Sequence, residues 1–260
     1  MQIENLFTFR ASDGNTVKLE YRESLPSAAL LAKEYAAAGV KDRYIVFTEK
    51  QTAFSALGTP LADGESEKGI YISCILRPSI FHSQAGLIGP LSALAFASAL
   101  EEHSPKKFGI GWVSDIYCEG RKIGGCHVEG KLDNFTSYEY LIINFAVKTD
   151  PKNFPPRLTD MVRQVFEDGN ASVGMIMAKT VINRFFNIYR DLKNPTKNMD
   201  KYKERFILTG KKVKYIDDGK RRSAKVLGIN KESCTLHIEL KDGNQHFINS
   251  PSLIVIPDRL

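Results

Sequence analysis

Residues 111–125 read Gly-Trp-Val-Ser-Asp-Ile-Tyr-Cys-Glu-Gly-Arg-Lys-Ile-Gly-Gly, and this stretch decides the fold. Strand-like residues lie on both sides of Gly120, and a glycine between two such runs is typical of a tight turn. The stretch therefore predicts a β-hairpin with arms near 109–118 and 122–130. The hairpin carries the chain's single tryptophan, an acid, a lysine and a glycine pair, which are Trp112, Asp115, Lys122, Gly124 and Gly125.

The spacing of these five residues resembles the active-site hairpin of the biotin–protein ligases. That family reads Lys-Trp-Pro-Asn-Asp, a few other residues, and then Lys-hydrophobic-Gly-Gly. The five residues fall at the family's positions, whereas Gly111 stands where the family has its first lysine. The resemblance therefore implies a biotin ligase ancestry with degenerate catalytic motifs.

The resemblance covers nearly the whole chain. Residues 49–53 look like the start of the family's biotin-binding segment, but residues 54–57 read Phe-Ser-Ala-Leu where the family has Gly-Arg-Gly-Arg. Residues 68–78 and 140–145 are similar to two later strands of the family. Of the family's Ser-Thr-Asn triplet, which aligns with positions 27–29, only Ser27 is kept.

Hydrophobic periodicity and the family order together predict an α+β fold, in which a mixed β-sheet flanked by helices is followed by a small C-terminal β-barrel. We expect a first hairpin over 6–23 and then a helix that Ser24 caps and Gly39 ends. Further helices are expected at 87–95, 155–169 and 172–192, and further strands at 44–47, 137–148, 210–216, 223–229, 235–240 and 245–248. The family order divides this into a ligase-like catalytic domain over 1–204 and a barrel domain over 205–260.

The composition fits a globular protein of 260 residues, with 43% hydrophobic residues, enough for one large core and a small second unit. No run of 18 apolar residues exists, so we expect no membrane span, and the first residues do not form a signal peptide. The four cysteines lack the paired spacing of a metal site, which favours the reducing cytoplasm.

A basic cluster near the C-terminus accounts for much of the net charge of +6. It is open to three interpretations: a nucleic-acid patch, a solvated barrel surface, or attraction to an acidic carrier protein. We favour the solvated surface and expect no DNA binding, because no aromatic ladder accompanies the charges and the helix near Pro26 begins too early for a preceding DNA-binding domain. The cluster consists of Lys211, Lys212, Lys214, Lys220, Arg221, Arg222 and Lys225.

The chemistry of a biotin ligase brings together two anions, a carboxylate and the α-phosphate of ATP, and so needs cations and backbone N–H groups. The resemblance implies that the arginine loop and the first hairpin lysine supply much of this. Losing two or three charge-assisted hydrogen bonds weakens adenylate stabilisation by ~3–8 kcal/mol if nothing compensates. Three nearby cations are candidates for compensation, namely Lys68, Arg77 and Arg121.

Lys122 is the predicted catalytic residue, because the wider superfamily has a lysine here that stabilises a developing oxyanion. The alternative is an exposed hairpin lysine. By family analogy Gln51 contacts the biotin head group, or it is a polar strand end. Asp115 and Asn144 either orient the hairpin or are structural. The full set of predicted ligand-binding residues is Gln51, Thr52, Trp112, Asp115, Gly124, Gly125 and Asn144.

The adjacent pair Cys126 and His127 suggests a thiol–base site, such as octanoyl transferases use. Neighbouring strand residues point to opposite faces of a sheet, so the two side chains cannot form a hydrogen-bonded dyad. We therefore do not assign them a catalytic role.

Three functions remain open. The chain is a divergent biotin–protein ligase with biotin and ATP with Mg²⁺ as substrates, a non-catalytic relative that binds a ligand or a carrier, or a lipoyl or octanoyl transferase or ligase that uses Lys122. The expected partner is the biotin carrier domain of a carboxylase or another acyl-carrier protein. Homodimer formation is left open.

Overall fold

A mixed sheet of eight strands organises the chain, with order β1-β2-β3-β4-β8-β7-β6-β5. The computed structural model describes residues 5–54, 61, 65–80, 82–133, 137–148, 172–217, 220–249 and 256–257. Within these ranges all neighbouring strands of the sheet are antiparallel except β2 and β3, which are parallel. The strands are β1 (Leu6–Arg10), β2 (Thr16–Arg22), β3 (Tyr44–Gln51), β4 (Glu67–Leu76), β5 (Phe108–Gly111), β6 (Asp115–Cys118), β7 (Arg121–Leu132) and β8 (Tyr138–Lys148).

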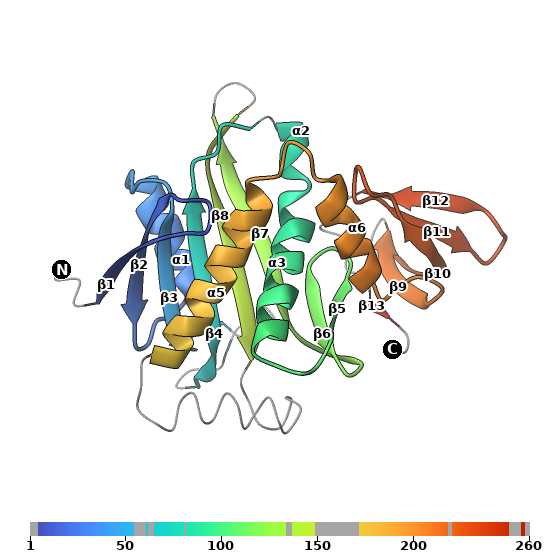
Figure 1. Cartoon of the computed structure of the whole chain (residues 1–260). Helices are drawn as coiled ribbons and strands as arrows, with labels where there is room; N and C mark the ends of the chain where they lie inside the picture. Colours follow the sequence, from blue (N-terminus) through green and yellow to red (C-terminus); the bar gives the residue numbers. More distant parts are fainter. Residues whose placement is uncertain are drawn as a thin grey trace.

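Helices cover both faces of this sheet (Figure 1). On one face lie α3 (Ile88–Glu102) and α5 (Ser172–Tyr189), with the short α2 (His82–Ala85) before α3. Their apolar sides pack on the sheet through aromatic rings: the Phe145 ring lies 5.7 Å from Phe96 of α3 and 5.7 Å from Phe185 of α5. These contacts place the apolar stripes of both helices in the core.

The opposite face carries α1 (Ala28–Ala37), which packs on β3, β4 and β8. Its alanines, Ala28, Ala32 and Ala36, let the helix lie close to the sheet. Ser27 caps the helix, because its side chain accepts a hydrogen bond from the backbone N–H of Leu30 at 3.3 Å. The prediction that Ser24 caps this helix was wrong, because the helix begins at Ala28 and its cap is therefore Ser27. Gly39, with φ of 85°, follows its end as expected.

The predicted first arm of the central hairpin, 109–118, is two strands rather than one. Residues 112–114 leave the sheet between β5 and β6, because the Trp112 indole turns into the core and donates to the Cys234 carbonyl at 2.8 Å. The turn at Gly120, with φ of 78°, is confirmed. This arrangement places Asp115 at the start of β6, opposite Gly111.

The sequence predicted neither the short α2 nor the longer α6 (Thr196–Arg205). Its composition is polar, and it buries only one narrow side that includes Met199 and Tyr202. The predicted helix over 155–169 lies outside the described residues.

The C-terminal part forms a second, antiparallel sheet with order β12-β11-β10-β9-β13. Its strands are β9 (Lys212–Asp217), β10 (Lys220–Ile229), β11 (Leu236–Leu240), β12 (Gln245–Ile248) and β13 (Ile256–Pro257). The first four were predicted, whereas closure into a barrel stays a prediction. Val213, Val226 and Leu236 belong to the same buried cluster as the large sheet. The domain boundary at 204–205 also stays a prediction. None of the helices in the described ranges combines the length and the apolar character needed to cross a membrane.

Candidate functional site

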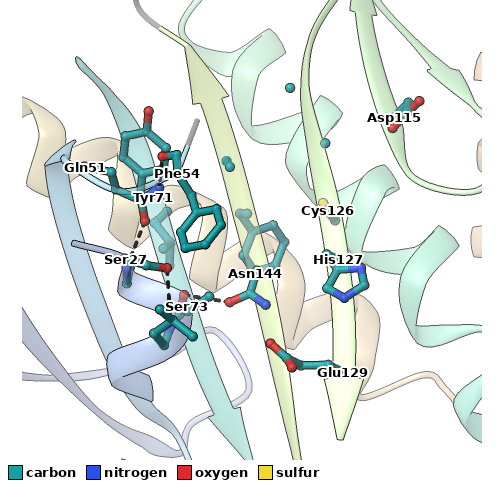
Figure 2. Close-up of a pocket in the computed structure, with 18 of the residues that line it drawn as sticks. Ser27, Gln51, Phe54, Tyr71, Ser73, Asp115, Cys126, His127, Glu129 and Asn144 are labelled. Atoms are coloured by element: carbon teal, nitrogen blue, oxygen red, sulfur yellow. Dashed lines mark hydrogen bonds between the residues drawn. The ribbon is translucent and has the colours of Figure 1, made fainter. Parts of the chain in front are cut away.

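A cavity of about 530 Å³ lies on the α1 face of the large sheet, over β4, β8 and β7. The N-terminus of α1 and the end of β3 form one wall, and the hairpin of β6 and β7 forms the other (Figure 2). Its labelled lining residues are Ser27, Gln51, Phe54, Tyr71, Ser73, Asp115, Cys126, His127, Glu129 and Asn144. Because α1 packs on β3, β4 and β8, the face of β7 is left open to the cavity.

The floor of the cavity is a polar row across three strands. Ser73 pairs with Asn144, and Asn144 pairs with His127, so the three side chains lie at one level on one face of the sheet. The Ser73 hydroxyl donates to Oδ1 of Asn144 at 2.7 Å. Within the described part of the chain, Nδ2 of Asn144 has no hydrogen-bond partner, which leaves an amide donor for a ligand.

Gln51 lines the cavity but uses both ends of its amide on the backbone. Its Oε1 accepts from the N–H of Ala28 at 2.8 Å, and its Nε2 donates to the Phe54 carbonyl at 2.8 Å. The residue is 5% exposed. Gln51 therefore ties the start of α1 to the segment after β3, and Figure 2 shows the Phe54 ring projecting into the cavity between Tyr71 and Asn144.

Lys122 and Asp115 form an ion pair at the hairpin wall, with Nζ 2.7 Å from Oδ1. A bulge in the pairing of β6 with β7 brings them together, since the register shifts between Ile116 and Tyr117. Both side chains are about one third exposed, at 37% and 30%. The pair is thus open to solvent and contributes ~0–1 kcal/mol to folding.

The charges around the cavity are few and mostly acidic. Lys122 is the only lysine or arginine among the described lining residues, while Asp115 and Glu129 are both acids. Glu129 is paired at 3.0 Å with Lys33 of α1. No cluster of three or more His, Cys, Asp or Glu residues that would hold a metal ion occurs among the described residues.

No family model matches the chain, but one kind of protein is similar to it in sequence and in fold. The bifunctional ligase/repressor BirA of Bacillus subtilis is 25% identical over 175 residues, which are 66% of this chain and 54% of that protein. The chain therefore spans about half the length of this relative. The biotin protein ligase of Aquifex aeolicus, solved with biotin and ATP, has a TM-score of 0.68 at 18% sequence identity. The match covers 92% of this chain and 99% of the Aquifex chain.

A second solved structure has the same fold. The Helicobacter pylori biotin acetyl coenzyme A carboxylase synthetase, with bound biotinylated ATP, has a TM-score of 0.56 at 15% identity, covering 88% of this chain and 98% of its own. The chain is thus similar in sequence to BirA over part of its length and has the fold of the biotin–protein ligases.

The ligase-like glycine pair at the hairpin is explained by strand packing. A Cβ on Gly124 would lie 2.1 Å from the Ala146 carbonyl oxygen, and one on Gly125 would lie 2.9 Å from the Ser114 carbonyl oxygen. Both glycines line the cavity, but the close approach that requires them is to backbone atoms of the protein.

Two residues predicted from the ligase pattern lie away from the cavity. Trp112 is 5% exposed and packs in the core, where its N–H bonds to Cys234. Thr52 is exposed, and its backbone N–H donates to the Leu25 carbonyl at 3.0 Å. The structure thus gathers five of the seven predicted ligand-binding residues and Lys122, and the five are Gln51, Asp115, Gly124, Gly125 and Asn144.

None of the three candidate cations lines the cavity in the described part of the chain. The Arg77 guanidinium donates to the carbonyls of Val40 and Ala36, at 3.0 and 2.7 Å, and so caps the C-terminal end of α1. Lys68 and Arg121 are exposed on the strands β4 and β7. We find no replacement for the ligase cations among these side chains.

The sequence reasoning missed Tyr71, Ser73 and Glu129 as lining residues. The signal was available, because strand residues two apart share a face, and Ser73 pairs with the predicted Asn144. His127 also faces the cavity, while the adjacent Cys126 pairs with Phe145 of the core. Burial raises the pKa of the Cys126 thiol well above its ordinary value, so the thiol is a poor nucleophile.

Proposed function

We propose that this chain is a divergent biotin–protein ligase-like protein that binds biotin or a related acyl group in the cavity and has a reduced or lost adenylating activity. The observation that carries the proposal is the retained pair of ligand donors, the Lys122 ammonium and Nδ2 of Asn144, in a cavity with no other lysine or arginine among its described lining residues. A carboxylate near Lys122 gains one charge-assisted hydrogen bond.

The proposed weakness of the adenylating step follows from charge. A carboxylate and a polyphosphate repel each other, and the one cation among the described lining residues, Lys122, is already paired with Asp115. Magnesium that enters with ATP is part of the substrate, and the described side chains supply no cluster for it. The proposed partner is the biotin carrier domain of a carboxylase or another acyl-carrier protein, met in the cytoplasm.

The test is biotin-dependent ATP–pyrophosphate exchange, with an ordinary ligase assayed beside this chain. We expect the rate to be lower by roughly 10²-fold or more, because two to three charge-assisted contacts are missing. Gly111→Lys alone will not restore it, since the segment after Phe54 also lacks the family's arginines. Exchange at an ordinary ligase rate would show that the proposed loss of activity is wrong.

A non-catalytic role as a binding protein is the second candidate. It is favoured by the covered position of Gly111, where a Cβ would lie 2.7 Å from the Tyr117 ring. In that case the acyl ligand and the carrier bind, and no exchange occurs at any enzyme concentration.

A further inference from the structure

Tyr117 occupies the space beside Gly111. A Cβ built on Gly111 would lie 2.7 Å from Cε2 of Tyr117 and 3.4 Å from Cβ of Asp115. Contacts under 3.0 Å are essentially never seen for real Cβ atoms, so any side chain at position 111 must displace the Tyr117 ring. The ring is 7% exposed and therefore has little free space to move into.

The strand register shows that this ring lies on the cavity face of the sheet. Gly111 pairs with Asp115, and directly paired residues of antiparallel strands point to the same face. Tyr117 follows Asp115 by two positions on β6 and so shares that face. Tyr117 is not itself a lining residue, but two of its neighbours on this face are, namely Asp115 on the same strand and Lys122, its partner on β7, and its partner on the other side is Gly109 of β5.

The chemistry around Tyr117 is neutral to acidic. Burial and the neighbouring Asp115 raise the pKa of Tyr117 to about 12, so its phenol is uncharged near neutral pH. Asp115 already engages Lys122 at 2.7 Å. A ligand that extends past this ion pair would meet an aromatic ring and a carboxylate, with no further described cation lining the cavity.

We propose that Tyr117 is a specificity-determining residue, whose ring closes the β5 end of the cavity so that the site takes a free carboxylic acid in preference to its acyl-adenylate or to ATP. This rests on the proposed function, because it specifies the ligand form of the same cavity. The acid places its single carboxylate at Lys122 and needs no room beyond Asp115. The adenylate adds a phosphate and a nucleoside, which require both room and positive charge.

The experiment is calorimetric titration of the full chain with biotin and with a non-hydrolysable biotinyl-adenylate analogue. For the parent protein we expect the analogue to bind no more tightly than biotin. In Tyr117→Ala the analogue should gain at least 10-fold in affinity relative to biotin, and in Gly111→Lys/Tyr117→Ala it should gain more, because a cation then enters the vacated space. Tyr117→Phe is the matched control and should keep the parent's ratio, since it keeps the ring.

Two results would overturn the inference. One is a parent protein that binds the adenylate analogue more tightly than biotin, a result that needs no variant. The other is a folded Tyr117→Ala protein whose affinity ratio equals that of the parent. If the parent binds neither ligand, the proposed function itself fails, which is a different outcome from either of these.

Discussion

At the scale of single residues, Lys122 was predicted from the sequence, while its ion pair was not. The spacing to the glycine pair indicated the residue, but the 2.7 Å contact to Asp115 depends on a bulge between β6 and β7 that no local pattern reveals. Trp112 shows the opposite case. Its place in the ligase motif suggested the cavity, and a hydrogen bond to Cys234, 122 residues away, holds it in the core.

Lys122→Ala should weaken biotin binding by about 1.5–3 kcal/mol, the size of a charge-assisted contact. Its effect on the free energy of unfolding should be small, because the pair with Asp115 is about one third exposed. Titration calorimetry and urea unfolding measure the two quantities. Lys131→Ala is the matched control, since Lys131 is also on β7 and forms an ion pair of 2.7 Å with Glu139. Neither residue of this pair lines the cavity. Equal affinities of the two variants for biotin would contradict the role of Lys122.

Tyr117 gives a prediction on pH. Its pKa rises from about 10 when unfolded to about 12 when folded, so the folded state holds the proton more tightly. Its contribution to stability is therefore complete below pH ~10 and is lost as pH rises to ~12. Tyr117→Phe cannot ionise, and its unfolding free energy should fall less between pH 9 and 11, by ~1 kcal/mol. Urea unfolding of both proteins at several pH values measures this difference. If the unfolding free energies of the parent and of Tyr117→Phe fall equally with pH, Tyr117 is not buried as described.

At the scale of elements, the link between β5 and β6 is held by the C-terminal half of the chain. Trp112 donates to Cys234, and the Val113 carbonyl accepts from the Tyr202 hydroxyl of α6 at 2.8 Å. Ser114 donates to the Cys126 carbonyl at 2.6 Å. The sequence predicted the strands from alternation, yet it predicted neither this break nor α6, because both depend on contacts between distant segments rather than on local propensity.

Trp112→Phe should destabilise the protein by about 1–3 kcal/mol, because it leaves the buried Cys234 carbonyl without its donor. Since the same link positions Asp115 at the cavity, we expect biotin affinity to fall as well. Circular dichroism during urea unfolding measures the first effect, because the variant has no tryptophan. Phe247→Leu serves as the control, as Phe247 is 66% exposed and its replacement should change stability little. Equal stability of the two variants would contradict the claim that the hydrogen bond from Trp112 to Cys234 stabilises the fold.

At the scale of the whole molecule, the order of strands and helices was predictable, and the depth and charge of the cavity were not. Alternation and helical periodicity depend on neighbours in the sequence, and together with the resemblance to the ligases they predicted the mixed sheet and most of the second sheet. The cavity depends on α1 packing against β3, β4 and β8, on Gln51 using its amide on the backbone, and on Tyr117 covering Gly111. All three depend on tertiary contacts, and such contacts can differ between proteins that share a fold, so a shared fold does not imply a shared activity.

The central claim is that the cavity binds an acyl ligand, and calorimetric titration of the unmodified chain with biotin, lipoate and octanoate tests it most directly. We predict saturable binding of at least one of these acids at one site per chain, and a gain of ~2.7 kcal/mol in unfolding free energy at 100 times its dissociation constant. The absence of binding heat and of stabilisation with all three acids would contradict the account.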